Sequence, residues 1–161
     1  MQTLYVPADE LADPTISATL PHVDSVVVLD RSIAQAGRLP AIDFARSRSA
    51  LLNPATVGKE HYNAFTESAE LLAEHTQLSR VVAIVGEDEL SEEKRTRFRR
   101  GQLLLNYFTQ PFVSVEVQTG RPGVRVARKD TVQDVRGILS GKFDTLAPER
   151  LQYVGAARNL A

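Results

Sequence analysis

The stretch Gly86–Arg100 reads GEDELSEEKRTRFRR, and its charge changes sign at one peptide bond. Five of the seven residues from Glu87 to Glu93 are acidic, and five of the seven from Lys94 to Arg100 are basic. Ser91 can cap a helix, and acids in the first turn with bases after them suit the helix dipole, at about 0.3–1 kcal/mol per well-placed charge. The stretch therefore predicts that a helix begins at Ser91.

The charge step has three interpretations. The first is a solvated first turn of a helix, and the second is nucleic-acid binding by the basic residues. The acidic block beside them argues against the second, because it would repel phosphate. The third is a protein contact surface at the tip of a helix-turn-helix. The dipole explains why the acids come first, but not why there are five of them.

Apolar spacing predicts helices on both sides of this stretch. Upstream, one helix face is predicted from Tyr62, Phe65, Ala69 and Leu72. The run Leu78–Val85 is too short to distinguish helix from strand. Downstream, a second helix that ends at Gln110-Pro111 is predicted from Phe98, Gly101, Leu105 and Phe108.

Three further elements are predicted towards the C-terminus. Valines alternate with polar residues over Val113–Val117, and the turn TGRPG and the run Val124–Val126 follow, which predicts a small β-hairpin. A helix carries Val132, Val135 and Leu139, and another is expected from Pro148 through Leu151 and Val154.

The first third of the chain has a different pattern. Two strands are predicted, Thr3–Val6 and the β-branched run Ser25–Leu29, which has the uninterrupted apolar character of strands buried inside parallel sheets. A short helix follows, with Asp30 as its N-cap and Gly37 as its stop. We therefore predict a mainly α protein. Its C-terminal helical bundle with one small β-hairpin occupies residues 53–161, preceded by a two-strand remnant of an α/β domain in residues 1–52.

Composition excludes several classes of protein. The chain has 161 residues, no cysteine and a formal charge of −1, so there is no thiolate metal site, no disulfide framework and no strong overall attraction to nucleic acid. No G-x-x-x-x-G-K-[ST] loop, G-x-G-x-x-G or G-x-S-x-G motif occurs. His61 and His75 are about 21 Å apart along one helix, too far to share a metal. We expect no metal site and no catalytic residue in these 161 residues.

Several segments together resemble the beta subunit of F-type ATP synthases. They are YVPADELADP (Tyr5–Pro14), HVDSVVVLDRSIA (His22–Ala34), NPATVGKEHY (Asn53–Tyr62), VGEDELSEE (Val85–Glu93) and TQPFVSVEVQTG (Thr109–Gly120). They occur in the family's order and at nearly its spacing. The chain looks like the C-terminal third of such a subunit, possessing the nucleotide-binding remnant and helical domain predicted above.

The resemblance supplies a role for the charge step. In the family, the DELSEED segment is the tip of a helix-turn-helix that presses on the central rotor. Here the corresponding residues are Asp88, Glu89, Leu90, Ser91, Glu92, Glu93 and Lys94, and Lys94 replaces an aspartate. A second rotor-contacting loop of the family matches Glu10, Ala12 and Asp13, with Ala12 where threonine is common.

The resemblance also implies part of an adenine pocket. The family stacks a tyrosine on adenine in a G-x-Y-P context, and this chain has Leu39 before Pro40. The other matching positions are Phe112, Val115, Gln118 and Thr119, and Tyr5 lies near the phosphate end. Gln118 replaces a second aromatic residue. Because base–aromatic stacking contributes about 1–3 kcal/mol per ring, we expect weakened nucleotide binding, as in a divergent second copy of the enzyme.

The family's phosphate loop, magnesium-side aspartate and catalytic glutamate precede Tyr5, so we expect these 161 residues alone to be inactive and to hold no bound cofactor. In an intact subunit the resemblance implies ATP or ADP with Mg, alpha subunits and the central gamma rotor as partners, and a peripheral complex on the cytoplasmic face of the membrane. A non-catalytic helical interaction module is the alternative. Nucleic-acid binding and membrane insertion are not expected, and the unpaired strand edges predict contacts with a second copy or rearrangement over the helical domain.

Overall fold

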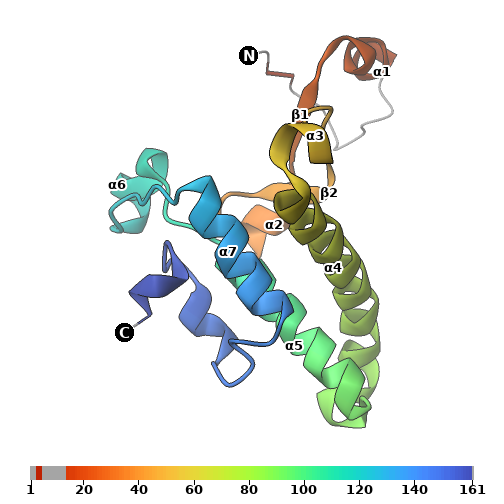
Figure 1. Ribbon diagram of the computed structural model, residues 1–161, viewed down its shortest axis with the longest axis vertical. Coiled ribbons are helices and arrows are strands. Elements are labelled where there is room, and N and C mark those ends of the chain that lie inside the picture. The colour runs from red at the N-terminus through yellow and green to blue at the C-terminus, as the bar shows by residue number, and fades with distance from the viewer. Residues whose placement is uncertain (1–2, 5–13, 161) are drawn as a thin grey trace.

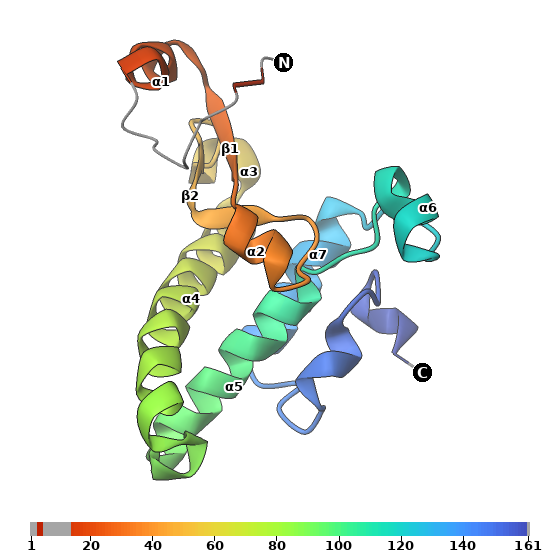
Figure 2. The same cartoon turned by 180° about the vertical axis from the view of Figure 1, so that it is seen from behind.

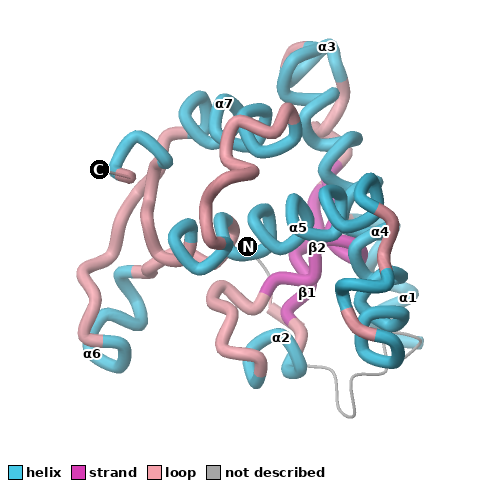
Figure 3. Tube along the Cα trace, turned by 90° about the horizontal axis from the view of Figure 1, so that it is seen from below, coloured by secondary structure: helices cyan, strands magenta, loops and turns pink. Residues whose placement is uncertain are grey.

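The computed structural model describes residues 3–4 and 14–160. The predicted strand Thr3–Val6 is therefore only partly covered. The predicted site residues Tyr5, Glu10, Ala12 and Asp13 lie outside the described residues. Helices make up most of the described chain, which confirms the mainly α class (Figure 3).

A long helical hairpin forms the frame of the molecule (Figure 1). Helix α4 (Lys59–Val85) ends at Gly86, whose φ of 89° lies in the region that glycine adopts without strain. The 3₁₀ turn η3 (Glu87–Glu89) follows, and α5 (Glu92–Tyr107) returns alongside α4. Ser91 is the N-cap residue as predicted, but its backbone carbonyl accepts from Arg95 (2.8 Å) and its hydroxyl forms no cap bond in the described structure.

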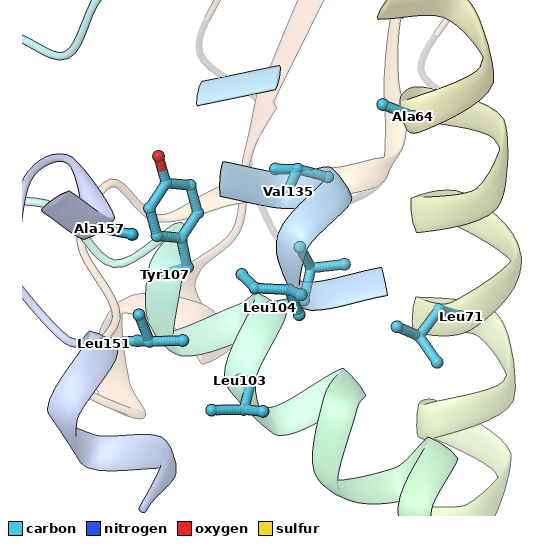
Figure 4. Close-up of a cluster of buried hydrophobic side chains, with 9 residues drawn as sticks. Ala64, Leu71, Leu103, Leu104, Tyr107, Val135, Leu151 and Ala157 are labelled. Carbon is cyan, nitrogen blue, oxygen red and sulfur yellow. The ribbon is translucent and has the colours of Figure 1, made fainter. Parts of the chain in front are cut away.

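Helix α7 (Arg128–Leu139) packs against both helices of the hairpin. The main core lies between α4, α5, α7 and the C-terminal segment (Figure 4). Leu104, Ile138 and Leu151 are completely buried there. A smaller cluster, formed by Leu78, Leu90 and Phe98, fills the turn end of the hairpin.

The predicted core face of α4 is wrong by one position. Its buried residues are Ala64, Ser68, Leu71, His75 and Leu78. Phe65 is 42% exposed and faces a groove. The prediction missed this face because it includes Ser68 and His75, two polar residues that an apolar spacing does not count.

The N-terminal part contains α1 (Pro14–Thr19), η2 (Leu20–His22), β1 (Ser25–Leu29), α2 (Arg31–Gln35), β2 (Ile42–Ser49) and α3 (Pro54–Val57). The predicted β1 and α2 are present. The Asp30 carboxylate accepts from the backbone N–H of Ser32 (2.7 Å) and of Ile33 (3.4 Å), and Gly37 has a φ of 74° after the helix. Figure 2 shows this part above one end of the α4–α5 hairpin.

Strand β1 is not buried on both faces as predicted. It pairs antiparallel with β2, with an irregularity between Val26 and Val28, and Val27 and Leu29 are 65% and 69% exposed. Sequence analysis missed β2, whose residues IDFARSRS include few β-formers.

The predicted hairpin over residues 113–126 is also wrong. The structure has the 3₁₀ turn η4 (Val113–Val115) and the short helix α6 (Glu116–Thr119) there. Val113 and Val117 are 73% and 99% exposed, so the alternating valines have no surface to pack on as a strand. The last predicted helix is shorter than expected: η5 covers Pro148–Leu151, Tyr153 has a φ of 59°, and η6 covers Ala157–Asn159.

Candidate functional site: an acidic tip and a loop junction

The segment Glu87–Lys94, which we term the acidic tip, lies at the turn end of the α4–α5 hairpin. Leu90 is only 7% exposed and packs on Leu78 and Phe98, so it anchors the turn and is not on its surface. The other tip residues except Glu87, which is half-buried, are exposed: Asp88, Glu89, Ser91, Glu92, Glu93 and Lys94. The tip therefore presents mainly carboxylates.

The arginines in the basic half of the charge step are engaged within the chain. Arg95 donates to the carbonyl oxygens of Asp88 (2.7 Å) and Leu90 (3.3 Å), which closes the turn. The other three arginines make ion pairs: Arg97 with Glu74, Arg99 with Glu87, and Arg100 with Asp144. These contacts count against the nucleic-acid interpretation, because the arginines are already paired with acceptors of this chain.

His75 joins α4 to α5 behind the tip. Its ring stacks on Phe98 with centroids 4.7 Å apart, and its Nδ1 lies 3.0 Å from the Phe98 carbonyl oxygen. Burial, with a smaller contribution from the charge of Arg38, lowers the pKa of His75. The ring is therefore neutral near pH 7, with Nδ1–H donating to Phe98.

At the other end of α5, three segments meet at what we term the loop junction: residues 37–40, 109–112 and 153–155. The backbone N–H of Gln110 donates to the Leu39 carbonyl (2.8 Å). Tyr153 donates through its backbone N–H to Thr109 (2.8 Å) and through its hydroxyl to Gly37 (3.1 Å).

The side chain of Gln110 holds the junction together. Its Nε2 donates to the carbonyl oxygens of Tyr107 (2.5 Å) and Gly155 (3.2 Å), and its Oε1 accepts from the backbone N–H of Gly155 (3.0 Å). An amide is suited to this position because it donates and accepts at once.

The junction brings together part of the predicted adenine pocket. Leu39 and Pro40 are half-buried, and Phe112, two residues after Gln110, is 40% exposed. Val115 lies in η4, and Gln118 and Thr119 lie in α6. Sequence analysis missed Gln110 and Tyr153, because neither a side chain that bonds three backbone groups nor a left-handed tyrosine has a sequence signal.

A groove of about 1040 Å³ separates the β1–β2 pair from α4. Its lining is mostly apolar and includes Phe44, Phe65 and Phe108, and Phe44 packs on Phe108 with ring centroids 4.7 Å apart. Within residues 3–4 and 14–160, no cluster of three or more histidines and carboxylates could hold a metal ion. Nor does this part of the chain contain a helix long and apolar enough to cross a membrane.

Comparison with known proteins agrees with this architecture. Residues 1–49 match the nucleotide-binding domain of the ATP synthase alpha/beta family, and residues 52–123 match the C-terminal domain of V and A type ATP synthase. A solved structure described as a unique ATP synthase subunit, NeqB, from Nanoarcheaum equitans superposes with a TM-score of 0.70 at 19% identity. The alignment covers 89% of this chain and 34% of that one, so the chain spans about a third of that subunit's length.

These matches define the class: the chain fits a part of an ATP synthase subunit. More particularly, it fits the C-terminal part of such a subunit, where the end of the nucleotide-binding domain leads into the helical domain. The resemblance to ATP synthases drawn from the sequence is thus confirmed at this level.

Proposed function

We propose that the chain belongs to the catalytic, beta-type subunit of an F-type rotary ATP synthase. Such an enzyme makes ATP from ADP and phosphate, or hydrolyses ATP, coupled to ion flow. The two family matches support an ATP synthase subunit. The segments DELSEE and VGKEHY support the F-type beta kind.

One observation carries this proposal: α5 connects the acidic tip to the loop junction. It begins at Glu92 in the tip and ends at Tyr107, three residues before Gln110. A helix of 16 residues is about 24 Å long and axially stiff. A displacement of the junction on nucleotide binding would therefore move the tip, which is what pushing a rotor requires.

In this proposal the chain's own residues contribute to base binding. Leu39, Pro40 and Phe112 present an apolar surface suited to one face of a purine. The proposal assigns phosphate binding, Mg binding and the reactive groups to other parts of the subunit; these 161 residues contain no phosphate-loop motif.

The proposed partners follow from the same assignment. Alpha subunits flank the subunit, and the exposed carboxylates of the acidic tip contact the central gamma rotor. The complex is peripheral, on the cytoplasmic face of a membrane. The alternative is a helical interaction module of the same family that binds partners without turnover, which the replacement of two aromatic pocket residues by Leu39 and Gln118 favours.

Photolabelling separates these two functions. The subunit would be irradiated with an adenine nucleotide that carries an azide on the base, and labelled peptides would be mapped by mass spectrometry. A catalytic subunit is expected to be labelled near Leu39 and Phe112, and excess ATP should remove the label. Labelling that ATP does not compete for would contradict the proposal and favour the interaction module.

A further inference from the structure

Tyr153 has an unusual backbone conformation at the loop junction. Its φ of 59° is in the left-handed region, which residues other than glycine rarely adopt without a compensating contact. Here the contacts are the bonds from its backbone N–H to Thr109 and from its hydroxyl to Gly37. The half-buried ring therefore spans the two segments that contain Leu39 and Phe112.

Arg121 lies over this ring. Its Cζ is 4.1 Å from the ring centroid, which is a stacking distance for a guanidinium on an aromatic face. The loop that carries Arg121 is itself fastened to the junction, because the backbone N–H of Val124 donates to the Pro111 carbonyl (3.0 Å). The segment from Thr109 to Pro111 thus positions Tyr153 directly and the loop that carries Arg121 through Val124.

We propose that Arg121, backed by Tyr153, is a further contact for the purine base of a nucleotide. Leu39 has no π face, so the predicted pocket lacks a stacking group at that position. The planar guanidinium of an exposed arginine can stack on a base, and the Tyr153 ring fixes its plane. This inference rests on the proposed function and adds a residue pair to the base site.

The test is a titration of the isotope-labelled chain followed by NMR. The probes are adenosine, which has a base and no phosphate, and inorganic phosphate. Adenosine is expected to shift the Nε resonance of Arg121 together with the backbone amides of Leu39 and Phe112. Arg121→Ala should weaken adenosine binding at least about fivefold, and Arg121→Lys should do so nearly as much because it retains only the charge. The control Arg125→Ala changes an exposed arginine of the same loop and should bind as the wild type does.

The possible results separate the role of Arg121 from the base site of the proposed function. If adenosine shifts Leu39 and Phe112 equally in Arg121→Ala, the role of Arg121 is wrong and the base site stands. If adenosine shifts none of these resonances, both are wrong. A shift of Arg121 with phosphate but not with adenosine also overturns the inference, because it shows an anion contact.

Discussion

At the scale of single residues, the contact between His75 and Gly101 shows how closely α4 and α5 approach. The ring of His75 lies where a Cβ at position 101 would be, 2.6 Å from the ideal Cβ position. A glycine is therefore required in the middle of α5 despite its low helix propensity. The sequence predicted Gly101 on the inner face of this helix but not the histidine opposite it.

Gly101→Ala is expected to destabilise the chain by about 1–3 kcal/mol, because the backbone-linked Cβ of His75 cannot move aside, and this overpacking exceeds the gain in helix propensity. Urea unfolding measures the effect. Gly137→Ala in α7 is the matched control. The atom nearest to its new Cβ is at the edge of the Phe143 ring, at 2.9 Å, and can move aside more easily than the Cβ of His75, so this variant should lose less stability. Equal or greater stability of Gly101→Ala than of wild type would contradict this account.

His75 predicts a pH dependence of stability. Its pKa in the folded chain is lowered from the ordinary value of 6.5, so the unfolded chain binds the proton more readily. The stabilisation is complete above pH 6.5 and is lost as the pH falls below 6.5 towards the folded pKa. Denaturant unfolding between pH 7.5 and pH 5.5 should show this loss. His75→Gln should make this loss of stability smaller, whereas the control His22→Gln, at an exposed site, should leave it unchanged. An unchanged loss in His75→Gln would refute the role given to His75.

At the scale of elements, a helix or strand could be predicted from the sequence where neighbouring residues alone determine it. The start of α5 and the caps of α2 were predicted because capping and charge order act within one turn. Strand β2 and the helical turns at residues 113–119 were not, because strand formation depends on what a segment packs against. Leu39, Pro40 and Phe112 came from family motifs, whereas Gln110 and Tyr153 became visible only once the fold joined distant segments.

Arg100 fastens α5 to the segment after α7, and it predicts a measurable loss of stability. Its guanidinium makes a bidentate contact with Asp144 (Nε–Oδ1 2.8 Å, Nη2–Oδ2 2.5 Å) and donates to the Leu139 carbonyl (2.9 Å). Arg100→Met is expected to cost about 1–2 kcal/mol, discounted for partial exposure. The adjacent Arg99→Met should cost less than about 1 kcal/mol, because the Arg99–Glu87 pair is more exposed. Thermal or urea unfolding compares the two variants. An equal loss of stability would contradict the role of Arg100 in fastening α5 to the segment after α7.

At the scale of the whole molecule, the two candidate sites lie at opposite ends of α5, and the helical core between them is well packed (Figure 4). Close-packed interiors transmit displacement instead of absorbing it. In the proposed function, the molecule would therefore transmit force between the proposed base site and a protein surface, and the reactive chemistry would lie elsewhere in the subunit.

That division predicts that residues 1–161 alone do not hydrolyse ATP. Phosphate release from the purified chain with Mg and ATP should equal that of a boiled sample. Turnover above this background that a chelator abolishes would show that the chain holds its own phosphate-binding and reactive groups.

In the proposed function, the acidic tip contacts the rotor. The chain has no cysteine, so a single introduced cysteine marks one position. Glu92→Cys would be placed in the synthase of the source cell and crosslinked with a short thiol reagent, with Gln133→Cys on the outer side of α7 as the control. We expect a crosslink from position 92 to the gamma subunit and none from position 133. Absence of the position 92 crosslink in an assembled, active synthase would contradict this expectation.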